Sequence, residues 1–249
     1  MTARHRSPEG LLRSSLTEVA ELVLQRECAG CGRTGTSWCA GCADALLGEP
    51  TLQRVAALPV WSTTDYRDQV RTAVVAWKDR GRADLTPALA QALRRSVLAA
   101  FGGAAAAPSR PSTGATVLLV PAPSSRPSRR ARGHDPVRDL ALRCAAGLRH
   151  RGVQARVVPA LVQARRVDDQ ATLGVADRAE NLAGALRVRR GWAGQLEGRQ
   201  CLVVDDVVTT GATLLECARA LAGAGAPVLA AATVAATRRR GHGAAGDGG

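Results

Sequence analysis

The sequence predicts an α/β fold in which a parallel sheet is flanked by helices and a small four-cysteine module precedes it. Three short apolar runs, Val117–Val120, Arg156–Val158 and Cys201–Val204, are each bounded by turn residues and followed by a helical or loop stretch. Such runs are typical of buried strands in a parallel sheet that is covered on both faces. Four cysteines between residues 28 and 42 form the separate module. With 249 residues and 46% hydrophobic content, the chain can build one ordinary core.

The remaining elements follow from apolar spacing and turn residues. Val70, Val74 and Trp77 recur at helical spacing, and Pro87 is well placed at a helix start. The other expected elements are a strand at 55–61, helices at 65–80, 88–100 and 214–222, a low-complexity surface loop at 102–115 and a final strand at 227–234. We expect a leader helix and the cysteine module in residues 1–50, the main domain in residues 51–237, and a disordered tail at 238–249.

The amino-acid composition limits the classes of ligand that the chain is expected to bind. The formal net charge of +13 suits a polyanion, either nucleic acid or a phosphate-rich substrate. Lys78 is the one lysine, and abundant Arg, Ala and Gly also fit a GC-rich genome, so both interpretations stay open. Aromatic residues make up 2% of the chain, which argues against folds that stack bases on aromatic rings. No secretory signal or membrane-spanning stretch is visible, so we expect a cytoplasmic protein without membrane insertion.

The cysteines are arranged in two matched pairs. Cys28-x2-Cys31 and Cys39-x2-Cys42 are separated by seven residues, so two tight turns offer four thiolates to one tetrahedral zinc ion. Four protein ligands leave no open position, which makes this zinc structural. Redox pairs and ordinary buried cysteines are the alternatives, but neither predicts matched spacing. The other three cysteines lie in apolar segments and are expected in the core: Cys144, Cys201 and Cys217.

A run of acids, threonines and glycine follows one of the predicted strands. Asp205 and Asp206 come at its carboxyl end, where α/β folds place ligands, and carboxylates there can accept from a sugar diol or hold Mg²⁺. The next residues open a helix, whose first amides attract a phosphate. A strand that ends in a capped helix would explain one Asp and one Thr, but not the whole run. No Walker A motif occurs, which argues against a nucleotide triphosphatase.

Residues 201–213 resemble the motif by which type I phosphoribosyltransferases bind phosphoribosyl pyrophosphate (PRPP). The resemblance implies the type I phosphoribosyltransferase fold with a flexible hood, here at about 163–185. It assigns Asp205 and Asp206 to the ribose hydroxyls. It assigns the 5-phosphate to the loop that follows, namely Thr209, Thr210, Gly211, Ala212 and Thr213. It also implies that Mg²⁺ accompanies PRPP.

Most of the chain is similar to the ComF/GntX-like competence family. After the four cysteines, the similarity is carried by Tyr66, Lys78-x-Arg80-Gly81, Val120-Pro121-x-Pro123, Arg132-Gly133, Arg166-x-x-x-Gln170-x-x-Leu173 and Arg178-x-x-Asn181-x-x-Gly184-Ala185. Two positions depart from the family pattern, namely His134-Asp135-Pro136 and Asp168. Both lie in the region expected to face pyrophosphate or the acceptor. The resemblance implies a role in DNA uptake during competence.

Three basic residues are the candidate catalytic groups: Lys78, Arg132 and Arg178. Arg132 belongs to a basic stretch, with Arg126, Arg129 and Arg130, that could neutralise a diphosphate or could be a solvated loop. Lys78 could instead form a structural ion pair. His134 is a weaker candidate, since a single loop histidine is more often merely exposed.

Two functions of different classes fit these features. The first is Mg²⁺-dependent phosphoribosyl transfer from PRPP to an unidentified acceptor. The second is a non-catalytic factor that binds single-stranded DNA through the same fold, with affinity that falls as salt is added. The expected partners are PRPP, single-stranded DNA with the DNA-uptake machinery, and a second copy of the chain in a dimer.

Overall fold

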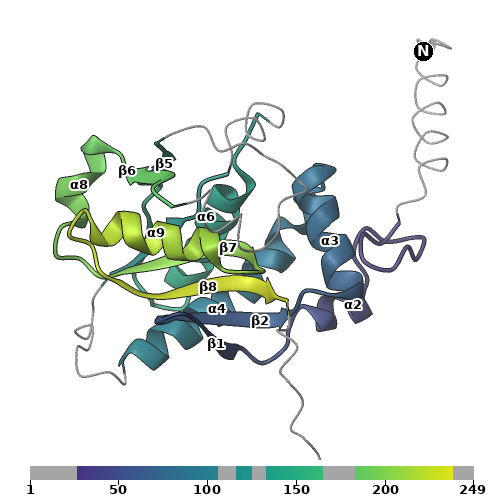
Figure 1. The fold of residues 1–249 in the computed structure, drawn as a ribbon. Coiled ribbons are helices and arrows are strands. Elements are labelled where there is room, and N and C mark those ends of the chain that lie inside the picture. Colours follow the sequence, from purple (N-terminus) through teal and green to yellow (C-terminus); the bar gives the residue numbers. More distant parts are fainter. Residues whose placement is uncertain (1–26, 106–115, 125–132, 165–182, 238–249) are drawn as a thin grey trace, which may run out of the picture.

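The computed structural model describes residues 27–105, 116–124, 133–164 and 183–237 (Figure 1). The predicted leader helix and the tail from residue 238 lie outside these residues. A six-stranded sheet forms the centre, in the order β1-β2-β8-β7-β3-β4. Every neighbouring pair is parallel except the β1–β2 hairpin at one edge. The strand bounds are Thr51–Val55, Leu58–Asp65, Val117–Pro121, Ala155–Val157, Cys201–Val208 and Val228–Ala236 for β1, β2, β3, β4, β7 and β8.

Helices cover both faces of this sheet (Figure 1). One core is shared by α3, α4 and α6, and by strand residues such as Leu202 and Val204. The other core is shared by α9 and by residues such as Cys201 and Val203, because successive side chains of a strand point to opposite faces. The helix bounds are Asp68–Asp79 for α3, Thr86–Ala105 for α4, Pro136–Arg149 for α6 and Ala212–Ala222 for α9. The mixed α/β prediction is therefore confirmed.

Shorter elements flank the main layers. The helix α2 (Ala40–Ala45) follows the third cysteine and lies beside α3, and the 3-10 turn η1 (Ala83–Leu85) joins α3 to α4. Two short strands, β5 (Leu161–Gln163) and β6 (Leu186–Val188), form a separate antiparallel pair next to α9. The helix α8 (Arg190–Leu196) follows β6. Within the described residues, no helix has the length and apolarity needed to cross a bilayer.

Several predicted boundaries were wrong: the helix α4 continues to Ala105, into the segment expected to be a loop at 102–115. Two other differences bear on the site. The strand expected at 55–61 is divided into β1 and β2 by a tight turn in which Ala56 has a φ of 51°. The strand that carries the two acids continues to Val208, since Val207 and Val208 pair with β8 beyond them. Asp205 and Asp206 thus lie within the last four residues of β7 instead of after it. The core placement of Cys144, Cys201 and Cys217 is confirmed, because each is at most 1% exposed.

Candidate functional site

The four paired cysteines converge on one point. Their sulfur atoms all lie within 4.8 Å of one another, and Cys31 Sγ and Cys39 Sγ are 3.7 Å apart. A tetrahedral zinc ion with Zn–S bonds of about 2.3 Å places its sulfurs about 3.8 Å apart. Gly30 leaves the room that this requires, since a Cβ there would lie 2.7 Å from Cys42 Sγ. The cluster could therefore hold a zinc ion with little movement.

Local hydrogen bonds lower the pKa of one of these cysteines, Cys28. Burial raises the pKa of the Cys28 thiol, but backbone hydrogen bonds from Cys31, Cys39 and Gly30 outweigh it and lower the pKa to about 6. The amide of Cys39 donates to Cys28 Sγ over 3.4 Å. Burial raises the pKa of Cys42, to which the neighbouring thiols also contribute. Amide donors of this kind stabilise thiolates, the form that binds zinc.

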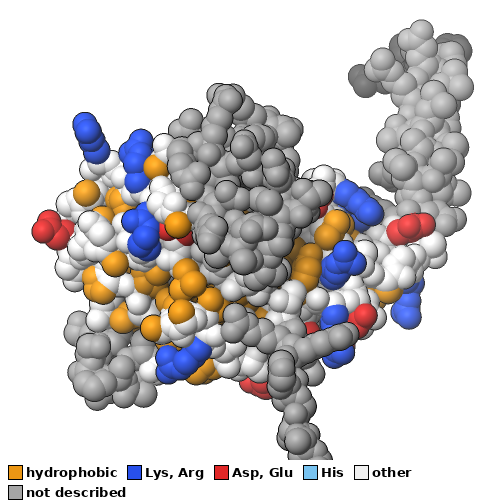
Figure 2. Space-filling model, in the orientation of Figure 1, with side chains coloured by type: hydrophobic (Ala, Val, Ile, Leu, Met, Phe, Trp, Pro, Cys, Tyr) orange, Lys and Arg blue, Asp and Glu red, His pale blue; other side chains and the backbone are white. Residues whose placement is uncertain are grey.

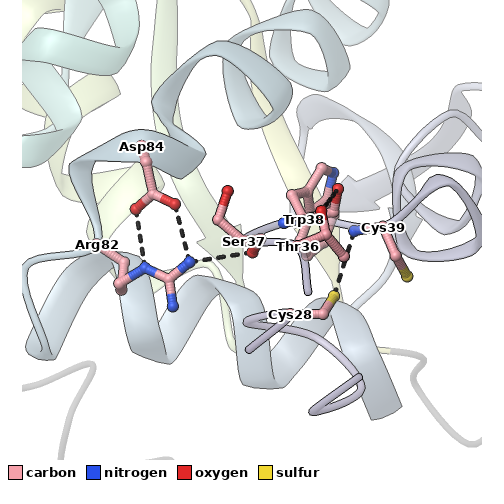
Figure 3. Close-up of polar contacts among 7 residues, drawn as sticks. All are labelled: Cys28, Thr36, Ser37, Trp38, Cys39, Arg82 and Asp84. Atoms are coloured by element: carbon pink, nitrogen blue, oxygen red, sulfur yellow. Dashed lines mark hydrogen bonds and ion pairs between the residues drawn. The ribbon is translucent and has the colours of Figure 1, made fainter. Parts of the chain in front are cut away.

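Hydrogen bonds and apolar packing hold the four-cysteine segment against the main core. Arg82, just after α3, donates to both carboxylate oxygens of Asp84, over 2.9 and 2.8 Å, and to the backbone carbonyl of Ser37 over 3.0 Å (Figure 3). Thr64 Oγ1 of β2 donates to the Ala45 carbonyl over 2.9 Å. Leu46, which directly follows α2, is 1% exposed and belongs to the α3/α4/α6 core. The four-cysteine segment therefore packs against the same hydrophobic core as α3, α4 and α6.

A second group of polar residues lies near the carboxyl end of β7. Lys78, in the last turn of α3, places Nζ 2.7 Å from Asp206 Oδ2. The Asp206 side chain is 5% exposed and the Lys78 side chain 36% exposed. The ion pair that sequence left as an alternative for Lys78 is therefore present, and it joins this residue to the acidic pair.

The two neighbouring acids differ in their surroundings. Asp206 continues the side of β7 that faces α3, whereas Asp205 lies on the side of α9, because side chains alternate along the strand. Desolvation of the Asp205 carboxyl and the nearby charge of Asp206 raise its pKa well above the ordinary value, and Lys78 offsets this only in part. Asp205 thus tends to keep its proton, whereas Asp206 has a cationic partner.

The loop after β7 is shaped by residues from other parts of the chain. Gly211 is the N-cap of α9 with a φ of +82°, and a Cβ there would clash with Val55 of β1. Thr210 Oγ1 accepts from the Ala212 amide over 3.3 Å, and the Thr237 amide donates to the Val208 carbonyl over 3.0 Å. Thr209 is exposed and Thr213 partly exposed. Sequence reasoning did not identify Val55 or Thr237, since neither belongs to a recognisable motif.

Glu216 of α9 was also missed. Its side chain is 4% exposed, and Oε1 accepts from the Leu186 amide of β6 over 2.9 Å. Arg219 donates to both Glu216 oxygens, over 2.6 and 2.8 Å, and to the Leu186 carbonyl over 2.9 Å. Burial alone would raise the pKa of Glu216, but Arg219 and the backbone donors lower it. This contact fixes the β5–β6 pair against the helix that follows the threonine loop.

Other predicted residues lie apart from this site or outside the described residues. Arg132, Arg178 and most of the expected hood at 163–185 are not among the described residues. His134 is exposed. Asp135 serves as N-cap of α6, where it accepts from the Arg138 amide over 3.3 Å and from Ser124 Oγ over 3.1 Å. A helix cap thus accounts for the aspartate in one of the two departures from the family pattern.

Comparison with known families supports the fold. A family model for the phosphoribosyl transferase domain matches residues 156–245. The match begins in β4 and includes β7, the threonine loop, α9 and β8. No curated protein matches the chain significantly. The chain thus combines a phosphoribosyl transferase domain, with its mostly parallel sheet, and an N-terminal four-cysteine cluster.

Proposed function

We propose that the chain binds PRPP at the carboxyl end of β7 and transfers its phosphoribosyl group. The Lys78–Asp206 ion pair carries this proposal, because it joins a cation to a carboxylate on β7, the strand that leads into α9. The first amides of a helix attract phosphate, and Gly211 contributes no side chain that would obstruct them. The phosphoribosyl transferase family match over this region supports the same interpretation.

Each group has a role in the proposed reaction. The loop from Thr209 to Thr213 holds the 5-phosphate, and the acids at 205 and 206 accept hydrogen bonds from the ribose hydroxyls. The bond between ribose C1 and the diphosphate oxygen breaks, with its electron pair leaving on the diphosphate. A nucleophilic atom of the acceptor forms the new bond to C1 and loses its proton. Mg²⁺, when bound with PRPP, neutralises charge on the diphosphate, and Lys78 can supply part of the same stabilisation.

Calorimetric titration with PRPP, with and without Mg²⁺, tests the pocket. Asp205→Asn and Asp206→Asn keep the side-chain size, and the double variant should lose about tenfold or more in affinity. Asp206→Asn removes a charged hydrogen-bond acceptor, and Asp205→Asn replaces the second carboxyl group with an amide. Asp139→Asn changes an exposed carboxylate of α6 and is the matched control. Wild-type affinity in the double variant would refute the proposed pocket.

The cysteine cluster is proposed to hold a structural zinc ion. Its donor set is complete for a tetrahedral site, which leaves no position for substrate. Purified protein should contain one zinc per chain, and Cys39→Ser should lose it. In this proposal residues 1–50 form the leader and zinc knuckle, residues 51–237 the transferase domain, and residues 238–249 a tail.

A second candidate function is a cytoplasmic role in DNA uptake of the ComF type, with single-stranded DNA as ligand. The net charge of +13 favours it. On the face shown in Figure 2, however, the Lys and Arg side chains of the described residues are scattered instead of forming one stripe. Binding of a fluorescent oligonucleotide should fall steeply with added salt. Absent or salt-independent binding would leave the charge as a consequence of codon usage.

A further inference from the structure

The end of α3 is connected to two sites: to the four-cysteine segment through Arg82, and to Asp206 through Lys78. Lys78 lies in the last turn of this helix and Arg82 follows it by four residues. Arg82 reaches the cysteine segment through the Ser37 carbonyl, while Lys78 reaches the sheet through Asp206. In Figure 1, α2 and the cysteine segment lie beside α3. A short piece of chain therefore touches both sites.

The Ser37 carbonyl that Arg82 contacts also accepts a hydrogen bond from within the cysteine segment. Ser37 O also accepts from the Ala29 amide over 3.1 Å, which links the residue after Cys28 to the turn before Cys39. A metal ion held by the cysteines would fix the positions of Ala29 and Ser37, because the ligand Cys28 directly precedes Ala29 and the ligand Cys39 lies two residues after Ser37. Arg82 is itself oriented by two hydrogen bonds to Asp84. The Ser37 carbonyl is thus held in a defined position relative to the end of α3.

The segment between Lys78 and Arg82 is constrained on both sides. The amides of Arg80 and Arg82 both donate to the Ala76 carbonyl, over 3.1 and 3.2 Å, and Gly81 supplies the left-handed turn with a φ of +69°. Trp77 is 3% exposed, and its Nε1 donates to Thr86 Oγ1 over 3.0 Å. These hydrogen bonds connect Arg82 to the last turn of α3, so a movement of Arg82 would also move Lys78 in that turn.

We propose that Arg82 is a positioning residue through which the metal-loaded cysteine cluster sets Lys78 against Asp206. Metal binding fixes the Ser37 carbonyl, Arg82 holds the end of α3 to that carbonyl, and Lys78 is thereby kept at the acid of the sugar-phosphate site. The inference rests on the proposed function only where PRPP is concerned, since the ion pair itself can be measured without ligand.

Lys78 is the one lysine of the chain, which makes its amine a single-site reporter. The rate of Lys78 acylation by an amine-reactive ester, read by mass spectrometry of the tryptic peptide, reports release of the amine from Asp206. We expect about fivefold faster acylation in Arg82→Gln and in metal-free protein, with Asp206→Asn as the upper limit. Arg71→Gln removes an exposed charge of the same helix and should react as wild type.

The acylation rates of the variants and of metal-free protein decide the inference. A wild-type rate in folded Arg82→Gln, or in metal-free protein with an unchanged circular dichroism spectrum, overturns it. Should Arg82→Gln fail to fold, Asp84→Asn keeps the guanidinium but loosens its orientation, and a wild-type rate there is equally decisive. The PRPP affinity of Arg82→Gln should fall together with the faster acylation. If wild-type protein does not bind PRPP, the proposed function fails, whereas the acylation rates still test the coupling.

Discussion

The Lys78–Asp206 ion pair gives the most direct stability prediction. The two groups are 2.7 Å apart, with the carboxylate 5% exposed and the lysine 36% exposed. At this distance the Coulomb attraction is ~6 kcal/mol for an effective dielectric constant of about 20 and ~1.5 kcal/mol in water. Desolvation of the carboxylate offsets most of it. Lys78→Met leaves Asp206 buried without its cation, so we expect a loss of about 2–3 kcal/mol in the free energy of unfolding.

A double-mutant cycle isolates this pair from packing effects. Asp206→Asn keeps the shape and should cost about 1 kcal/mol, because the Lys78 side chain is 36% exposed and its ammonium group can be hydrated. The double variant should cost about 1–2 kcal/mol less than the sum of the single changes, since no buried charge is left unpaired. Urea unfolding of zinc-loaded protein, followed by tryptophan fluorescence, measures all four values. Additivity within about 0.3 kcal/mol would refute a stabilising ion pair.

Three further predictions concern the threonine loop and its supports. Because the pKa of Asp205 is raised, native protein keeps a proton that unfolded protein has lost, so the free energy of unfolding should fall as pH rises above the ordinary Asp range. Asp205→Asn should remove this pH dependence, which denaturation at several pH values measures. Glu216→Gln should cost about 2 kcal/mol. Because the pKa of Glu216 is lowered in the folded protein, its contribution to stability should be complete above the ordinary Glu range and be lost as pH falls below that range, in wild type but not in Glu216→Gln. Gly211→Ala should cost about 2 kcal/mol, and less in a Val55→Ala background, where thermal unfolding should show relief of the clash.

Local sequence determined the parts of this protein that depend on near neighbours. The apolar runs predicted β3, β4, β7 and β8 because a strand buried on both faces needs consecutive apolar side chains. The paired cysteine spacing predicted a cluster because two tight turns bring four sulfurs together. Helical spacing of Val70, Val74 and Trp77 predicted α3 for the same local reason.

Tertiary structure decided the contacts between distant segments. Lys78 is 128 residues from Asp206, and nothing near the lysine in sequence indicates which carboxylate it will meet. Val55 lies against Gly211, and Arg82 against Ser37, only because hairpin and helix packing bring them there. The extension of β7 past its acids depends on pairing with β8, which is a property of the neighbouring strand. Sequence thus identified the chemical groups, whereas packing of the sheet and α3 set which of them face one another.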